Sequence, residues 1–468
     1  MHKIFKNTKK IHFIGIGGIG MSGMAELLHE NGFRISGSDI NESERTIHLK
    51  KIGLKVSNSH NKNNIKSTNL IVYSAAIDSQ NPEIVEAKKQ KIPIIKRAEL
   101  LGELIKLKKT SIAVSGTHGK TTTASMIASV LIEAKLDPTI IIGGIVNKFD
   151  NNNISGNGDL IVVEADEFDK SFLSLQPTFS VVNNMELEHL DIYKDINDLS
   201  DTFIKFINST PFYGTVSICI DSQQIKNILP RINKNFKTFG ITNKNADVIG
   251  YNLNFNKNNT FFDVKINKKD TLDIFLNVPG LHNIYNALAA ITVCLDLNIP
   301  HEKIVKGLKK YNGVKRRFEI KYENINNRKI KIIDDYAHHP SEVSATIEAI
   351  KSGWGKRRLI TVFQPHLYSR TKDFHRDFSK ALNNADINFL VPIYPAREAP
   401  IKGVSSLLIS EGLRDINHKY TYILDDKKRI PEEINKIVEK NDIILFMGAG
   451  DIYKMIEPTY KKINENKL

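Results

Sequence analysis

The sequence has few of the residues that mark secreted or membrane proteins. It contains only two cysteines, Cys219 and Cys294, which lie in separate apolar segments and form no C-x-x-C pair or metal-ligand spacing. We therefore expect two buried, reduced core residues and a reducing compartment. No apolar run approaches the roughly 20 residues that cross a bilayer. The lysine-rich start at residues 3–10 leads into a glycine-rich stretch without a convincing cleavage site, so we expect a cytoplasmic protein with no membrane partner.

A basic stripe with interleaved aromatic residues is also lacking. The formal net charge of +14 could indicate nucleic-acid binding. However, the lysines are scattered through Asn- and Ile-rich stretches such as residues 61–66 and 265–269, which indicates a compositional bias. We therefore expect anionic substrates and no nucleic-acid partner. The length of 468 residues predicts three domains, because an average domain has about 150 residues.

The first block has the pattern of a dinucleotide-binding unit. Residues 11–14 read as a strand, and the glycines that follow form a G-x-G-x-x-G turn into a helix: Gly15, Gly17 and Gly20, with Gly18 between them. Ser38 and Asp39 follow a second strand at 33–36, and Asp39 stands nineteen residues after Gly20. Taken alone, this fingerprint predicts an NAD-dependent dehydrogenase. This glycine pattern identifies the fold more reliably than it identifies the bound nucleotide.

A further strand at residues 70–73 ends in the small residues Ser74 and Ala75, where a ligand can approach the carboxyl end of a parallel sheet. Residues 81–90 and 99–107 read as helices. We place the end of the first domain at residue 107, because a charged patch there precedes the next strand.

The second block opens with a phosphate-binding loop between a strand at 108–115 and a helix from Thr121. The residues of this loop are Gly116, Thr117, His118, Gly119, Lys120, Thr121 and Thr122. Backbone amides at such a helix start bind phosphate oxygens, the lysine neutralises the terminal phosphates, and the hydroxyl of Thr121 can bind magnesium. Only two residues separate the glycines, against four in the usual P-loop.

Carboxylates follow the next strand, at residues 160–163. A carboxylate there is placed to hold a nucleotide-bound magnesium, and Glu164 is the best candidate. Asp166, Glu167 and Asp169 can equally form an acidic, solvated turn. After a strand at 179–182, His189 with its flanking carboxylates suits a second metal position or a plain hydrogen-bonding role.

An Ala-rich helix at 287–297 follows His282. Asn283 and Asn286, three residues apart, face one side of a helix and can contact an adenine or ribose, or cap the helix.

The third block, from residue 314, repeats the strand, polar loop and helix pattern. It predicts a doubly wound parallel sheet with polar residues at its carboxyl edge. These residues include Arg317, Asp335, Tyr336, His366, Arg370 and Arg397. An arginine at this edge can bind a carboxylate or phosphate group, although most arginines form surface ion pairs.

Taken in order, these motifs resemble those of the Mur ligases, the ATP-dependent amino-acid-adding enzymes of peptidoglycan synthesis. The resemblance covers essentially the whole chain and rests on the loop at 116–123, Glu-Ala-Asp-Glu at 164–167, His189, His282-Asn283 with Asn286, Arg316-Arg317-Phe318 and the run at 335–340. Within the family, residues 14–23, 363–366 and 394–398 are similar to those of members that join L-alanine to UDP-N-acetylmuramate.

The resemblance implies a role for each block. The first binds the UDP sugar, with Gly15, Gly17, Gly18, Gly20, Ser38, Asp39, Ser74 and Ala75, which demotes the NAD interpretation. The second binds ATP and Mg²⁺, with Lys120 and Thr121 at the phosphates, Thr121, Glu164 and His189 at the metal, and Asn283 and Asn286 at the adenosine. Arg317 and Asp335 also serve ATP, and Tyr336, His366 and Arg370 hold the amino acid. Lys120, Glu164, His189, Arg317 and Asp335 are the implied catalytic residues.

Three positions refine the resemblance. Glu188 stands where many relatives have aspartate, and Leu367 where some have arginine. Phe203 occupies the slot of the carbamylated lysine found in sister ligases that add later residues, which favours the alanine-adding class.

We therefore predict an α/β protein with three domains: a Rossmann-like UDP-sugar domain at 1–107, a P-loop-type ATP domain at 108–313 and a Rossmann-like amino-acid domain at 314–468. The expected reaction forms an acyl phosphate on the lactyl carboxylate, which the amine of L-alanine attacks. A monomer or weak homodimer is expected. The alternatives are a recycling ligase that attaches a tripeptide, a dehydrogenase that leaves Lys120 without a role, and a nucleic-acid-dependent ATPase that leaves the first glycine turn without one.

Overall fold

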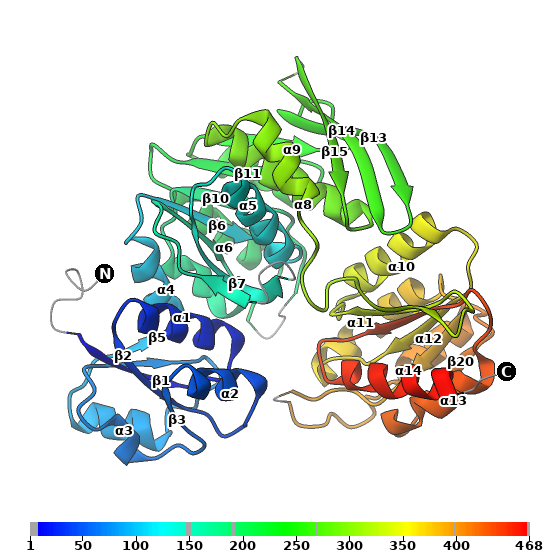
Figure 1. Cartoon of the computed structure of the whole chain (residues 1–468), viewed down its shortest axis with the longest axis horizontal. Coiled ribbons are helices and arrows are strands. Elements are labelled where there is room, and N and C mark those ends of the chain that lie inside the picture. Colours follow the sequence, from blue (N-terminus) through cyan, green and yellow to red (C-terminus); the bar gives the residue numbers. More distant parts are fainter. Residues whose placement is uncertain (1–7, 147–150, 189–191, 268, 397, 466–468) are drawn as a thin grey trace. The chain divides into compact units, whose positions relative to one another are not determined.

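The computed structural model describes residues 8–146, 151–188, 192–267, 269–396 and 398–465. In these residues the strands form three sheets of five, ten and six strands (Figure 1). The chain divides into two compact units. One contains residues 1–252, 262–275 and 285–311, and the other contains 253–261, 276–284 and 312–468. Within the described residues, no helix combines the length and apolar composition that a bilayer crossing requires.

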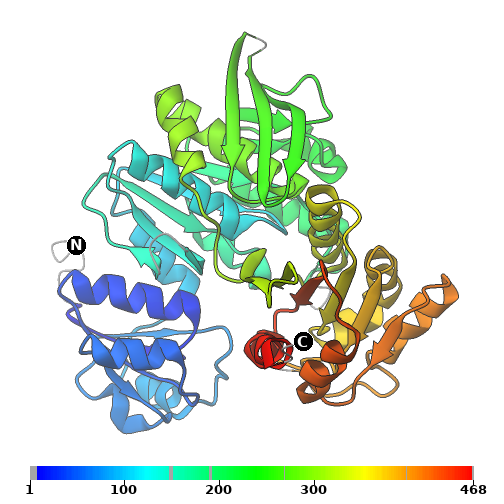
Figure 2. The ribbon, with the colours of Figure 1, turned by 45° about the vertical axis from the view of Figure 1, so that its right-hand side comes forward.

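The first sheet has the order β3-β2-β1-β4-β5, and every neighbouring pair is parallel. Its strands are β1 Lys10–Ile14, β2 Arg34–Ser38, β3 Lys55–Ser57, β4 Leu70–Tyr73 and β5 Ile94–Lys96. Helices cover both faces: α1 Ile19–Glu30, α2 Glu44–Lys51, α3 Pro82–Lys89 and α4 Arg97–Ile105 (Figure 2). The strand order reverses between β1 and β4, so the glycine turn after β1 lies at the switch point, where this fold binds ligands.

The second sheet has the order β15-β14-β13-β12-β11-β10-β6-β9-β7-β8. Its central strands are parallel and almost completely buried: β6 Thr110–Ser115, β9 Leu160–Glu164, β10 Phe179–Val182 and β11 Thr215–Cys219. The remaining strands of this sheet up to β12 are β7 Thr139–Val146, β8 Asn151–Ile154 and β12 Phe236–Gly240. Helices α5 Lys120–Glu133, α6 Ile196–Asn208, α7 Gln223–Ile228, α8 Leu281–Asp296 and α9 His301–Lys309 complete this part. Both cysteines are free and buried, which confirms that expectation.

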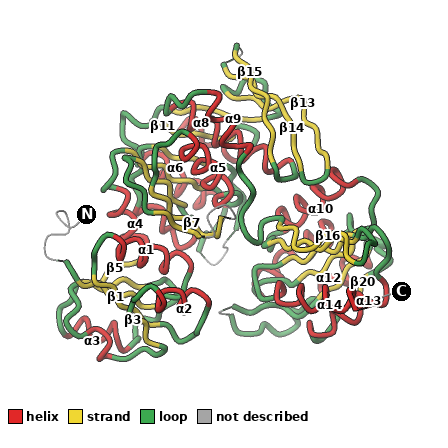
Figure 3. The backbone as a smooth tube through the Cα atoms, in the orientation of Figure 1, coloured by secondary structure: helices red, strands yellow, loops and turns green. Residues whose placement is uncertain are grey.

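Three strands of this sheet were not predicted: β13 Val248–Asn256, β14 Asn259–Ile266 and β15 Asp270–Leu276 (Figure 3). Burial alternates along β14, as in a strand with one face in the core. Two of the lysines that we attributed to composition are described: Lys265 lies near the end of β14, and Lys269 lies in the following turn. The predicted helix at 287–297 in fact begins at Leu281 and includes both asparagines.

The third sheet has the order β16-β17-β21-β18-β19-β20. Its strands are β16 Glu319–Ile325, β17 Ile330–Asp335, β18 Leu359–Phe363, β19 Ile387–Leu390, β20 Thr421–Ile423 and β21 Ile443–Met447. The helices are α10 Pro340–Trp354, α11 Tyr368–Leu382, α12 Leu407–Asp415, α13 Ile430–Ile437 and α14 Ile456–Glu465. The expectation of a wholly parallel sheet was wrong for β16, which pairs antiparallel with β17 because only a short turn joins them.

A buried polar cluster beside the first sheet was not predicted. The carboxylate of Glu83 is fully enclosed and accepts hydrogen bonds from the Ser38 hydroxyl (2.6 Å) and the Asn64 amide (2.6 Å). The rings of His12 and His60 lie 3.5 and 3.2 Å from it. Burial alone would raise the pKa of Glu83, but the hydrogen bonds from His12, Ser38 and Asn64 outweigh burial and lower this pKa to about 2.

We therefore expect Glu83 to make stability pH-dependent. The pKa of Glu83 in the folded state lies below its unfolded value of 4.5. Ionised Glu83 therefore adds about 3 kcal/mol to the free energy of unfolding above pH 4.5, and this contribution is lost as the pH falls toward 2. Urea unfolding of Glu83→Gln should show a deficit at pH 6 that shrinks toward pH 3. Glu86→Gln on the same helix is the control. An equal deficit at both pH values would contradict this prediction.

Candidate functional site

The glycine turn after β1 is held in place by the end of β2. Gly15 has a φ of +79°, and its amide donates to the carbonyl of Ser38 (2.8 Å). The carboxylate of Asp39 accepts from the Gly17 amide (2.9 Å), and a Cβ on Gly17 would lie 2.8 Å from this carboxylate. Any side chain at residue 17 would therefore shift the Asp39 carboxylate. Asp39, a predicted UDP residue, therefore stabilises the turn. Ser38, another predicted UDP residue, is buried, and its hydroxyl donates to Glu83.

Ser74 and Ala75 follow β4, next to the turn. The Cβ of Ser74 lies 3.2 Å from the place where a Cβ on Gly15 would stand. Ala75 is exposed. The structure thus brings together the glycine turn, Asp39 and the end of β4 at the switch point of the sheet.

The phosphate-binding loop joins β6 to α5, as predicted. Gly116 and Gly119 have φ values of +128° and +82°. Polar side chains from the neighbouring β10 edge hold the loop: Asn184 accepts from the His118 amide (2.8 Å), and the Thr117 hydroxyl donates to the carbonyl of Glu186 (3.1 Å). The loop is therefore a rigid cradle of backbone groups.

Lys120, the first residue of α5, lies over this loop. Its ammonium donates to the carbonyls of Gly116 (2.8 Å) and Thr117 (3.2 Å) and to the carboxylate of Glu167 (2.7 Å). Burial alone would lower the pKa of Lys120, but attraction to Glu167 and Asp166 outweighs burial and raises this pKa. The lysine therefore keeps its positive charge at the helix start.

Glu167 was the main omission from the predicted site. Its side chain is only 2% exposed and forms an ion pair with Lys120, so a solvated acidic turn is wrong for this residue. The Tyr193 hydroxyl also donates to its backbone carbonyl (2.6 Å). The sequence offered a signal, because Glu167 follows a strand adjacent to the one that precedes the loop.

The predicted metal residues Thr121 and Glu164 lie together. The Glu164 carboxylate accepts from the Gly143 amide (2.6 Å) and from the Thr121 side chain. Burial raises the pKa of Glu164. Two oxygen ligands at the ends of β9 and the phosphate loop suit a hard cation such as Mg²⁺. His189 lies outside the described residues. Glu188, just before it, is buried.

Phe203 is a core residue of α6. It is fully buried and makes an edge-to-face contact with Phe172, at 5.2 Å between ring centroids. The Phe203 side chain is therefore part of an apolar core.

The two asparagines of α8 have different contacts. Asn286 accepts from the Thr123 hydroxyl (3.1 Å), to which Asn183 also donates (2.9 Å), so Asn286 packs against the phosphate loop. Asn283 donates to the carbonyl of Pro279 (2.6 Å). Both are buried.

The second compact unit contains the other predicted residues. Asp335, at the end of β17, accepts from the amides of Phe318 (2.7 Å) and Ala337 (2.7 Å). Burial raises the pKa of Asp335 to about 6, and the opposing charge of Arg317 limits the shift. The guanidinium of Arg317 lies 4.9 Å from the ring centroid of Tyr336 and 3.7 Å from the Glu342 carboxylate. Arg317, Asp335 and Tyr336 thus form one cluster.

His366 and Arg370 form a second cluster in this unit. The Arg370 guanidinium, 7% exposed, contacts the His366 ring at 3.2 Å, and that ring stacks on Tyr394 at 5.7 Å between centroids. The His338 ring lies 5.8 Å from that of His366. Leu367 has a φ of +71°. Arg397 lies outside the described residues.

The phosphate-binding loop follows a central parallel strand of the second sheet. Rossmann-like sheets precede and follow this part in the sequence. Together these features define a multidomain nucleotide-binding enzyme. Three family models match in order: "Mur ligase family, catalytic domain" over residues 10–109, "Mur ligase middle domain" over 114–294 and "Mur ligase, glutamate ligase domain" over 316–450. The chain belongs to the Mur ligase family.

Relatives match over nearly the full length. UDP-N-acetylmuramate–L-alanine ligases of Desulforapulum autotrophicum and Geobacter sulfurreducens are 44% and 42% identical, over 97% and 99% of this chain and 98% and 99% of theirs. The crystal structure of the UDP-N-acetylmuramate-alanine ligase MurC from Thermotoga maritima is 30% identical, with a TM-score of 0.83 over 98% of this chain and 100% of that one.

Proposed function

We propose that this chain joins L-alanine to the lactyl carboxylate of UDP-N-acetylmuramate with hydrolysis of ATP to ADP and phosphate. The observation that carries this proposal is the similarity, over nearly the whole length, to relatives of that activity. The phosphate loop with Lys120, whose side chain is 16% exposed and pairs with Glu167, supplies the chemistry that such a ligase needs. We assign the UDP sugar to residues 1–107, ATP to 108–313 and L-alanine to 314–468, in the cytoplasm.

The carboxylate must be activated before an amine can attack it, because a free carboxylate has no good leaving group. Transfer of the terminal phosphoryl of ATP to the lactyl carboxylate breaks the bond to ADP and forms an acyl phosphate. The loop amides at 116–122 hold the phosphates, and the charge of Lys120 offsets the negative charge of the transferring group. Asn286 braces the loop, and we assign Asn283 and Asn286 to the adenosine side.

Magnesium fits the oxygen ligands of Thr121 and Glu164, and His189 is the third residue that we assign to it. When bound, the ion supplies further positive charge at the ATP phosphates. Thr121 and Glu164 already lie within hydrogen-bonding contact, so this chain orients both groups itself.

The amine of L-alanine attacks the acyl phosphate, loses its proton and expels phosphate through a tetrahedral intermediate. We assign the alanine carboxylate to Arg370, which contacts His366 and carries the planar fork that pairs with two carboxylate oxygens. Tyr336 is assigned to the same amino acid. We assign Arg317 and Asp335 to ATP.

The test is phosphate release from ATP by the purified protein. Release should require both UDP-N-acetylmuramate and L-alanine, and reactions that lack either one are the controls. Glycine, L-serine and the L-alanyl-γ-D-glutamyl-meso-diaminopimelate tripeptide should be compared at equal concentration. Preference for the tripeptide would move the assignment to a recycling ligase, and no release with any acceptor would refute the proposal.

We expect Gly119→Ala to raise the KM for ATP at least tenfold. A Cβ there would lie 2.3 Å from the Asn286 side-chain oxygen, and the φ of +82° disfavours any other residue. Gly53→Ala is a matched control, because Gly53 has a φ of +97° and no neighbour within 4 Å. That variant should lose about 1 kcal/mol of stability with an unchanged KM. Equal KM values for both variants would contradict the loop's role.

A further inference from the structure

Arg97, the first residue of α4, lies against the glycine turn. One guanidinium nitrogen would lie 3.2 Å from a Cβ on Gly20, in the first turn of α1. A Cβ at Gly20 would therefore press against the guanidinium. Arg97 was not among the predicted site residues, and it precedes the helix that the sequence predicted at 99–107.

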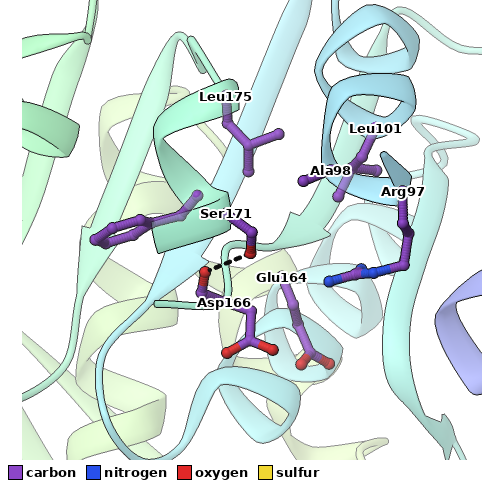
Figure 4. A pocket seen from close by; sticks show the side chains of 8 residues that line it. Arg97, Ala98, Leu101, Glu164, Asp166, Ser171 and Leu175 are labelled. Atoms are coloured by element: carbon purple, nitrogen blue, oxygen red, sulfur yellow. Dashed lines mark hydrogen bonds between the residues drawn. The ribbon is translucent and has the colours of Figure 1, made fainter. Parts of the chain in front are cut away.

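Arg97 also lines a small pocket that extends toward the metal residues. The other lining side chains come from α4 and from the segment after β9: Ala98, Leu101, Glu164, Asp166, Ser171, Phe172 and Leu175. Figure 4 shows the Arg97 guanidinium extending over this pocket toward the Glu164 carboxylate. All of these residues belong to the same compact unit. Arg97 thus lies between the glycine turn and the end of β9.

Two lysines of this compact unit have carboxylate partners. Lys96 pairs with Asp169 at 3.9 Å and Lys120 with Glu167 at 2.7 Å. Across the described parts of the chain, by contrast, no carboxylate forms an ion pair with Arg97. Glu164 is hydrogen-bonded instead by Gly143 and Thr121. A half-buried guanidinium without an ion pair, next to a helix start, is suited to an anionic ligand.

We propose that Arg97 binds the diphosphate of the UDP sugar. This inference rests on the proposed function, which assigns that diphosphate to the glycine turn. Contact with Gly20 places the guanidinium at the start of α1, where phosphate oxygens are favoured by the helix amides. The planar fork can donate to two oxygens at once, which an amine cannot do. Since Arg97 also faces Glu164, it orients the sugar's diphosphate relative to the site of phosphoryl transfer.

Calorimetric titration with UDP and with UMP tests this role. Arg97→Ala should weaken UDP binding about 10- to 100-fold and UMP binding much less, because a bidentate charged contact is lost. Arg97→Lys, which keeps the charge but loses the fork, should fall between. Arg34→Ala, an exposed arginine at the amino end of β2, is the matched control and should bind UDP as the wild type does. The KM for UDP-N-acetylmuramate should rise with the loss of UDP affinity, and those for ATP and L-alanine should stay within twofold.

Different results would overturn different statements. If the wild type binds UDP and Arg97→Ala binds it equally well, the role of Arg97 is refuted and the proposed function stands. Equal losses of UDP and UMP affinity together with a lower melting temperature would identify Arg97 as a structural residue and refute the proposal. If the wild type does not bind UDP, the assignment of the first sheet to the UDP sugar fails, and the role of Arg97 fails with it.

Discussion

Lys120→Ala is expected to lower the turnover number for ATP-dependent phosphate release about 1,000-fold. Lys120 lies over the phosphate loop, with its ammonium within hydrogen-bonding distance of two loop carbonyls. Removing one preorganised group that stabilises transition-state charge typically costs about two to three orders of magnitude in turnover. The effect should fall on turnover more than on the KM for L-alanine, because the amino acid is assigned to other residues.

Lys109→Ala is the control for this loss. Lys109 is 80% exposed and pairs with Asp159 on the surface, just before β6, so its removal should change activity less than twofold. Circular dichroism and a melting curve must show that Lys120→Ala is folded. A folded Lys120→Ala protein that keeps a tenth of the wild-type turnover would refute the assignment of this lysine to the phosphates.

The sequence predicted the strands that precede functional loops with little error. Residues 70–73 and 179–182 are strands in the structure with the same bounds. Each is a short, continuously apolar run followed by glycine or polar residues, which is typical of a buried parallel strand. The phosphate loop was equally readable, since its glycines and Lys120 are adjacent in the chain.

The errors have physical causes. Strands β13 and β15 carry residues with low strand propensity at exposed positions, three asparagines in β13 and two aspartates in β15, which obscured the alternation of buried residues. The antiparallel β16 lies at a sheet edge, where topology depends on a short turn rather than on apolar content. The sequence placed Ser38 and Asp39 at the end of β2, where they lie. It did not show that the Ser38 hydroxyl donates to Glu83, because Glu83 is distant in the sequence.

Glu167 illustrates the same limit and yields the second large prediction. Whether a carboxylate after a strand is solvated or buried depends on the lysine of another strand-loop-helix unit. Glu167→Gln should leave the largely enclosed charge of Lys120 with only neutral hydrogen-bond partners and the longer-range attraction of Asp166 and Glu188. We expect a loss of about 3 kcal/mol in the free energy of unfolding and a fall in turnover of about 100-fold. Urea unfolding and phosphate release measure the two effects.

A double substitution separates the ion pair from other effects of Glu167. Lys120→Met alone should also destabilise the protein, because it leaves Glu167 buried without its cation. Lys120→Met with Glu167→Gln removes both charges, so the double variant should be more stable than the sum of the two single losses predicts. Glu103→Gln, which breaks an exposed pair with Lys106, should change the unfolding free energy by less than about 1 kcal/mol. Additive losses in the double variant would show that Glu167 does not stabilise the lysine, and its catalytic effect would then need another cause.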